Sequence, residues 1–172
     1  MLKKVNLVSS LRAGALAAFL FSMPAVVFIL SADYTLSWLL YVGSFMFLVV
    51  IWVHIMQEHH KRKENESTVS LVFASHITTI IGVFISCIIC FILMLIFVPG
   101  YLSGRPDRLL SDEPANTVID KTGGLGAHVF IVATLVNFTV GSFTSIILPF
   151  YAKRNQTHDS REPTPFHQHG AR

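Results

Sequence analysis

Two histidines are the residues of this sequence best suited to hold a metal ion or a haem. His54 lies near the end of an apolar stretch over residues 35–55, and His76 lies about one turn into the next stretch, over residues 72–98. If these stretches are antiparallel neighbouring helices, the two imidazoles lie at similar depth, and imidazole is a common ligand of zinc and haem iron. No second pair of ligands matches that depth. We therefore favour histidines bonded to backbone or solvent, and expect no cofactor.

A second set of candidates consists of small and polar side chains near the middle of the apolar stretches. The set comprises Ser22, Ser44, Ser86, Thr134, Asn137, Gly141 and Ser145. The last four recur at spacings of three, four and four residues, which places them on one face of a helix. Because helices in lipid associate through small residues and interhelical hydrogen bonds, the pattern predicts a helix-packing face. The alternative is that these residues line a path for a substrate.

Several kinds of chemistry lack the residues they need. Carriers coupled to protons or sodium use a carboxylate at membrane depth, and the apolar stretches hold none. Cys87 and Cys90 lie within the third stretch, where hydrocarbon disfavours the thiolate, so we expect packing residues and not a redox pair. The sequence contains no phosphate-binding loop, nucleophile elbow or zinc-protease motif, and we predict a protein that is not an enzyme.

The elements that position these residues follow from the distribution of charge. Of the 172 residues, 52% are hydrophobic and only 13% are charged, whereas an average soluble domain is about 25% charged. Asp, Glu, Lys and Arg are absent from residues 13–32, 34–57, 67–104 and 122–152. About 20 helical residues cross a hydrocarbon core, so each gap is long enough for one span.

We therefore predict an all-α integral membrane four-helix bundle. The predicted four-span domain covers residues 1–155, with spans over about residues 13–32, 35–55, 72–98 and 126–151. An outer loop is expected over residues 101–125, and a disordered cytoplasmic tail over residues 156–172. The link between the first two spans is so short that they are expected to form an antiparallel hairpin.

The orientation of the bundle follows from its Lys and Arg residues, which accumulate in cytoplasmic loops. Ten of them lie in the N-terminal segment, the connector between spans two and three, and the C-terminal tail, whereas three lie in the predicted outer loop. Both termini are therefore predicted to be cytoplasmic. The basic residues are scattered over helix ends and do not form one face, so we expect no nucleic-acid partner.

The order of several features resembles a known group of proteins. The features are a first helix that carries Gly14, a second span followed by a basic connector, a third span opened by Ser70, Leu71, Val72 and Phe73 with Gly82 following, and a fourth span that leads to a polar tail. This order is similar to that of a family of small uncharacterised four-span bacterial membrane proteins. The resemblance covers most of residues 1–155 and implies the same topology, but it implies no activity and no site residues.

The function predicted from the sequence is that of a non-enzymatic accessory or interaction subunit in the bacterial cytoplasmic membrane. Its expected surroundings are the lipid bilayer and either a membrane-protein partner or further copies of the chain. One alternative is a small transporter or permease subunit whose polar face around Asn137 lines the path. A further alternative is a haem- or metal-binding membrane protein that uses His54 and His76.

Overall fold

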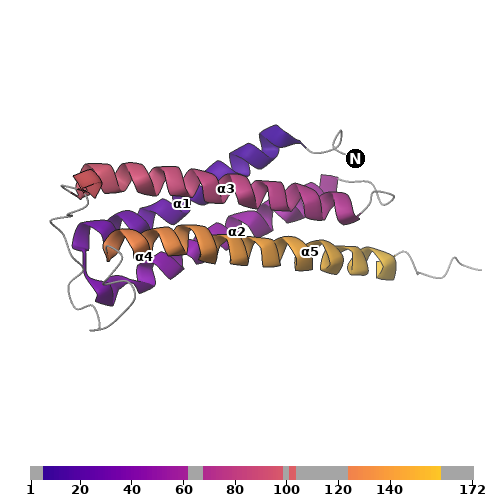
Figure 1. Ribbon diagram of the computed structural model, residues 1–172. Coiled ribbons are helices and arrows are strands. Elements are labelled where there is room, and N and C mark those ends of the chain that lie inside the picture. The colour runs from indigo at the N-terminus through magenta and orange to yellow at the C-terminus, as the bar shows by residue number, and fades with distance from the viewer. Residues whose placement is uncertain (1–5, 62–67, 99–100, 104–123, 160–172) are drawn as a thin grey trace, which may run out of the picture.

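The computed structural model describes residues 6–61, 68–98, 101–103 and 124–159, and these residues are helical almost throughout. Four long helical segments dominate (Figure 1). They are α1 (Leu7–Ser31), α2 (Trp38–Lys61), α3 (Thr68–Phe97), and a last segment made of α4 (Leu125–Ile131), the π-helical turn η5 (Val132–Val136) and α5 (Asn137–Asp159). Short 3-10 turns, η2 (Tyr34–Leu36) and η3 (Tyr101–Ser103), precede α2 and follow α3. No strand occurs among the residues described.

Each of the four segments is long and apolar enough to cross a membrane. This confirms the all-α prediction and the number of long apolar helices. α1, α2 and α5 extend beyond the gaps in charge, and α3 begins four residues before the span predicted for it. α1 begins at Leu7 because the Asn6 side chain caps it, accepting a hydrogen bond from the Ser9 backbone N–H at 3.1 Å. α2 continues to Lys61 and α3 begins at Thr68, since a helix does not have to end where its apolar stretch ends.

The predicted loop and tail lie only partly within the described residues. η3 occupies the start of the predicted loop, and α4 begins at its last residue, Leu125. Residues 104–123 lie outside the described part of the chain. α5 continues to Asp159, so the first four residues of the predicted disordered tail are helical, whereas residues 160–172 are not described.

The four helices surround a common core in the order α1, α2, α5, α3. α1 packs against α2 and α3, and α5 packs against the same two helices. α2 and α3 therefore lie on a diagonal with little direct contact, although they are consecutive in the chain. The connection from α1 to α2 is a tight hairpin: Ala32 takes a left-handed conformation, with φ of 50°, and the Asp33 carboxylate accepts a hydrogen bond from the Thr35 N–H at 2.9 Å.

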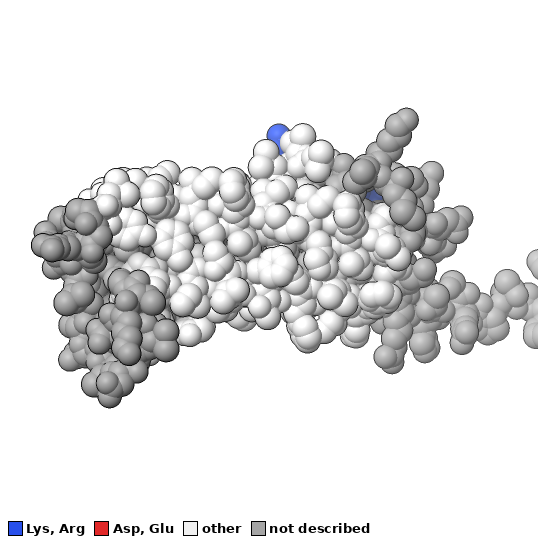
Figure 2. All heavy atoms as spheres, in the orientation of Figure 1, with Lys and Arg blue, Asp and Glu red and all other residues white. Residues whose placement is uncertain are grey.

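Aromatic and branched side chains fill the core, and equally apolar side chains cover the outside. The largest fully buried side chains include Phe21, Phe28 and Phe47. On the outer surface Phe45, Phe84 and Phe143 are each about two thirds exposed. Figure 2 shows a long uncharged face, with Lys and Arg visible only toward the end of the bundle where the N-terminus lies. A helix bundle that is apolar on both its inner and outer sides fits a hydrocarbon solvent better than water.

Glycines set the distance between three of the four adjacent helix pairs. A Cβ on Gly14 of α1 would lie 3.0 Å from the backbone N of Gly82 in α3. A Cβ on Gly43 of α2 would lie 2.9 Å from the backbone O of Phe21 in α1. In α5, Gly141 lies directly against the side chain of Thr79 in α3. Such close approach lets backbones pack in lipid, where no hydrophobic effect drives helices together.

Candidate functional site

Three predicted site residues lie within about one turn of one another in depth in the bundle interior, and we call them the interior polar layer: Ser44, Ser86 and Asn137. The ring of Phe47 lies against Gly82, which puts these two residues at one level. Ser44 is three residues from Phe47 and Ser86 is four residues from Gly82, so both lie about 5 Å further along, in the same direction. Asn137 is one turn from Gly141, which contacts Thr79, and it therefore lies within about one turn of the two serines.

The polar atoms of this layer are buried without hydrogen bonds. Asn137 and Ser86 have no exposed surface, and Ser44 is 3% exposed. Within the described residues, neither the amide N nor the amide O of Asn137 has a hydrogen-bond partner, and the same holds for the hydroxyls of Ser44 and Ser86. Leaving such a group unpaired costs about 1–3 kcal/mol. Within the described residues, the hydrogen-bonding groups of this layer are therefore not used to join its helices.

Other predicted members of the polar set already have partners. The Ser145 hydroxyl lies 3.3 Å from the Thr79 hydroxyl and links α5 to α3 across a buried contact. The Ser22 hydroxyl donates to the backbone O of Phe19 at 2.7 Å, within its own helix. Gly141 is buried against Thr79. Ser145 and Gly141 thus lie where two helices meet, and Ser22 is buried on the inner side of α1.

Thr134 lies off the face on which the sequence spacing places it. Its hydroxyl donates to the backbone O of Phe130 at 2.6 Å, and its side chain is only partly buried. The cause is the π-helical turn η5, which holds more residues per turn than an α-helix and so shifts the register. Ala133, one residue earlier, takes the buried position in line with Asn137. π-Turns are often found at functional sites, and this one ends directly before Asn137.

The two candidate metal-ligating histidines lie in different surroundings. His54 is 5% exposed and lines a hollow between α1 and α2. His76 is partly buried on α3, and its Nδ1 lies 3.0 Å from the backbone O of Val72. His54 lies on α2 and His76 on α3, and these two helices are diagonal to each other in the bundle. The two histidines therefore do not lie on helices that pack side by side, even if their depths are equal. Among the described residues, no group of three His, Cys, Asp or Glu side chains could hold a metal ion.

The hollow beside His54 is the second candidate site, and we call it the α1/α2 hollow. Its volume is about 540 Å³. Its wall is apolar, with Leu16, Val49 and Val53, whereas its rim carries Ser9, Arg12, His54, Gln57 and Lys61. In Figure 1 the first turns of α1 rise above α3 at this end of the bundle.

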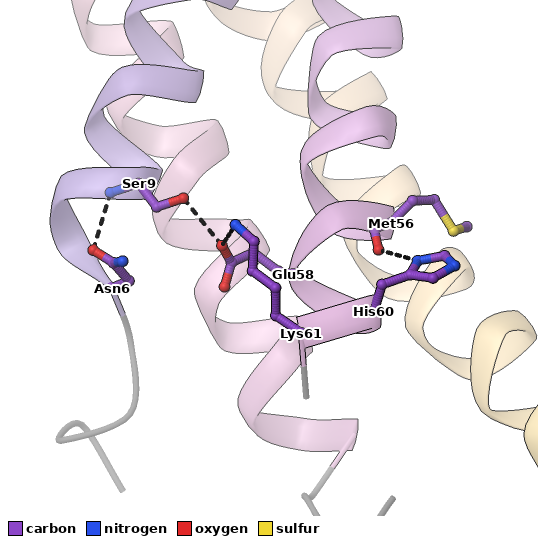
Figure 3. A network of polar contacts seen from close by, with 6 residues as sticks. All are labelled: Asn6, Ser9, Met56, Glu58, His60 and Lys61. Atoms are coloured by element: carbon purple, nitrogen blue, oxygen red, sulfur yellow. Dashed lines mark hydrogen bonds and ion pairs between the residues drawn. The ribbon is translucent and has the colours of Figure 1, made fainter. Parts of the chain in front are cut away.

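Polar contacts tie the two helices together at the rim of this hollow (Figure 3). The Ser9 hydroxyl of α1 donates to Oε1 of Glu58 in α2 at 3.0 Å. Lys61 Nζ lies 3.4 Å from the same oxygen. The Lys61 side chain is 66% exposed and that of Glu58 only 15%. The carboxylate therefore faces the helix contact, while the ammonium group remains accessible.

The sequence analysis used Arg12 and Lys61 only to orient the bundle and did not identify the α1/α2 hollow. A usable signal was present. Arg12 is the last basic residue before the first apolar stretch and Lys61 the first basic residue after the second, and a tight hairpin brings those ends together. What the sequence does not contain is the packing of α1 on α2 that leaves a hollow between them.

Comparison of the chain with protein-family models, with curated proteins and with solved structures finds no match.

Proposed function

We propose that this chain is a four-span integral protein of the bacterial cytoplasmic membrane with both termini in the cytoplasm. The distribution of Lys and Arg supports this orientation, because ten such residues lie in the segments at one end of the bundle and three in the segment at the other. Among the described residues, Arg12 and Lys61 lie at the same end, as the Ser9–Glu58 contact requires.

Its proposed role is that of a non-enzymatic accessory or interaction subunit, which binds another membrane protein or further copies of itself through the outer faces of its helices. The observation that carries this proposal is the closed centre of the bundle. There the Phe47 ring packs on Gly82, and the backbones of Gly14 and Gly82 touch. The small residues Gly14 and Gly82 thus pack against other helices of the same chain. The apolar side chains on the outside of the bundle are therefore the surface that remains for a partner.

The test is to isolate the tagged full-length chain from native membranes in polymer-bounded bilayer discs and identify bound proteins by mass spectrometry. We expect a membrane protein, or the chain itself, at a fixed stoichiometry. Phe45→Ala, Phe84→Ala and Phe143→Ala remove exposed rings from α2, α3 and α5 in turn. We expect one of the three to release the partner while leaving the bundle folded. Recovery of a monomer alone contradicts the proposal.

Membrane orientation needs an independent experiment. Reporter fusions to the C-terminus, and insertions near residue 112, should show activity on opposite sides of the membrane, with the C-terminal reporter active in the cytoplasm. A C-terminal reporter active outside the cytoplasm contradicts the proposed topology whatever the chain binds.

A second candidate function is that of a small transporter subunit, and the unpaired amide of Asn137 is the observation that favours it. A polar group without a partner in the membrane interior is a binding group for a passing solute or water. Vesicles that contain the protein would then recover their volume faster than empty vesicles after a urea or glycerol gradient has shrunk them, because the solute enters faster. Asn137→Leu, which is close to Asn in shape, should remove this difference without changing assembly. Equal rates for loaded and empty vesicles contradict this candidate.

A further inference from the structure

The α1/α2 hollow combines the two chemical surfaces that a phospholipid has. Below its rim the wall consists of Leu16, Val49, Val50 and Val53, which would contact hydrocarbon. At the rim lie Arg12 and Lys61, and the residues that line the hollow include no carboxylate. The hollow lies at the end of the bundle that carries Arg12 of α1 and Lys61 of α2. In a membrane, charged residues at the ends of spans lie at the depth of the lipid headgroups.

A second hollow of about 520 Å³ adjoins the first along α2. Its lining includes Trp52, Met56 and His60, and it shares Val53, Gln57 and Lys61 with the α1/α2 hollow. This depression is lined by α2 alone and is shallower than the α1/α2 hollow, and Lys61 belongs to both.

The electrostatics of the rim select the kind of headgroup. The Glu58 carboxylate lies beside this rim without lining the hollow, and it is engaged by the Ser9 hydroxyl at 3.0 Å and by Lys61 at 3.4 Å. Because the Glu58 side chain is 15% exposed while that of Lys61 is 66% exposed, the positive charge is the one presented outward. The hydroxyl of Ser9 and the amide of Gln57 add hydrogen-bonding groups to the lining.

We propose that the α1/α2 hollow binds an anionic phospholipid, with the lipid phosphate held by Arg12 and Lys61 and an acyl chain along Leu16, Val49 and Val53. The site requires insertion in a bilayer, which is part of the function proposed above, but it requires neither a protein partner nor transport. The bound lipid fills the hollow and keeps the rim contacts between α1 and α2 together.

The experiment uses the intrinsic fluorescence of Trp52. The chain has two tryptophans, so Trp38→Phe leaves Trp52, beside the hollow, as the sole reporter. This full-length variant is placed in phosphatidylcholine vesicles that contain an equal mole fraction of either brominated phosphatidylglycerol or brominated phosphatidylcholine. Bromine quenches a nearby indole. We expect stronger quenching by the anionic lipid, because it is concentrated at the site.

Charge variants in the Trp38→Phe background test whether the rim causes the preference. Arg12→Gln and Lys61→Gln are each expected to lower the relative affinity for the anionic lipid about fivefold, which corresponds to about 1 kcal/mol. Glu58→Gln should raise it, because the amide can still accept from Ser9 but no longer opposes the lipid charge. The matched control is Lys153→Gln on α5, since the lining of the hollow comes from α1 and α2. We expect no change for this control.

If the two brominated lipids quench Trp52 equally in the Trp38→Phe variant, the proposed lipid site is contradicted. A preference that Lys153→Gln reduces as much as Lys61→Gln does also contradicts the site, because it would reflect overall charge alone. Flotation of the vesicles on a density gradient measures insertion separately. If the protein floats with the vesicles but shows no preference, the lipid site is wrong and the proposed membrane protein stands; if it does not float, the proposed function fails first.

Discussion

Gly14 and Gly82 bring α1 and α3 into backbone contact, so that a Cβ on Gly14 would lie 3.0 Å from the Gly82 nitrogen and 3.0 Å from the Thr78 carbonyl oxygen. Both atoms belong to the backbone of a long helix and cannot move independently. The contact joins two helices that are separated in the chain by the whole of α2. It therefore constrains how the two halves of the bundle fit together.

The first prediction concerns this contact. Gly14→Ala should lower the free energy of unfolding by about 1–3 kcal/mol, because α1 and α3 must separate to admit the methyl group. Thermal or denaturant unfolding in detergent measures the loss. Gly126→Ala is the control, since its Cβ would meet the ring of Tyr101 at 3.1 Å, and a side chain near the end of a helix can shift. Equal losses for the two variants would show that backbone contact is not the cause.

The second prediction concerns the hydrogen bond between Thr79 and Ser145. Such interhelical bonds contribute about 0.6 kcal/mol on average in membrane proteins. In a double-mutant cycle with Thr79→Val and Ser145→Ala, we expect a coupling energy of about that size. Ser44→Ala serves as the reference, because the Ser44 hydroxyl has no hydrogen-bond partner among the described residues and its removal should not destabilise the fold. A coupling of zero would mean that the 3.3 Å contact adds no stability.

The third prediction tests the π-turn η5. Deletion of Leu135, which is 63% exposed within the turn, removes the extra residue and should leave a regular α-helix with both ends in register. Deletion of Phe143, which is 66% exposed in regular α5, should instead rotate everything after it by about 100°. We expect the first variant to fold and the second to lose its thermal transition. If both variants fail to fold, the prediction is wrong: the π-turn would then be needed to place the inward-facing residues of α5 correctly.

The fourth prediction concerns Tyr101, whose ring packs against Gly126 and lies 6.3 Å from the ring of Phe91 between centroids. Burial raises the pKa of Tyr101 above its usual value of 10. Because the folded state disfavours the phenolate, the stability due to this group is complete below pH 10. It is lost as the pH rises from there through the folded-state pKa. Melting temperatures at rising pH should therefore fall more steeply for the wild type than for Tyr101→Phe. Parallel curves would contradict the raised pKa of Tyr101.

The sequence predicts the long helices well because their signal is a simple one: stretches without charge that are each long enough for a span. It also indicates that Ser44, Ser86 and Asn137 lie at similar depth, since depth follows from counting residues along each helix. Which helices are neighbours does not follow from such counting. For this reason equal depth does not establish that His54 and His76 are close, and the structure places their helices on a diagonal.

Thr134 shows a second limit of the sequence analysis. Its spacing of three residues from Asn137 indicates a shared face only if the helix is regular between them, and η5 is not. Nothing in the run of Val132, Ala133 and Leu135 distinguishes a π-turn from an α-turn. The α1/α2 hollow was missed for a similar reason, because a cavity depends on the angle between two helices and not on the residues of either one.

The contact between Gly14 and Gly82 has a consequence for biogenesis. α1 and α2 can pair as soon as both have left the ribosome, but the surface of α1 around Gly14 must wait for α3. Until then Gly14 faces lipid or the insertion machinery, without the backbone of α3 against it. The earliest helix is thus among the last to be fully covered. A ribosome stalled between α2 and α3 would hold a hairpin that still lacks both of its neighbours in the bundle, α3 beside α1 and α5 beside α2.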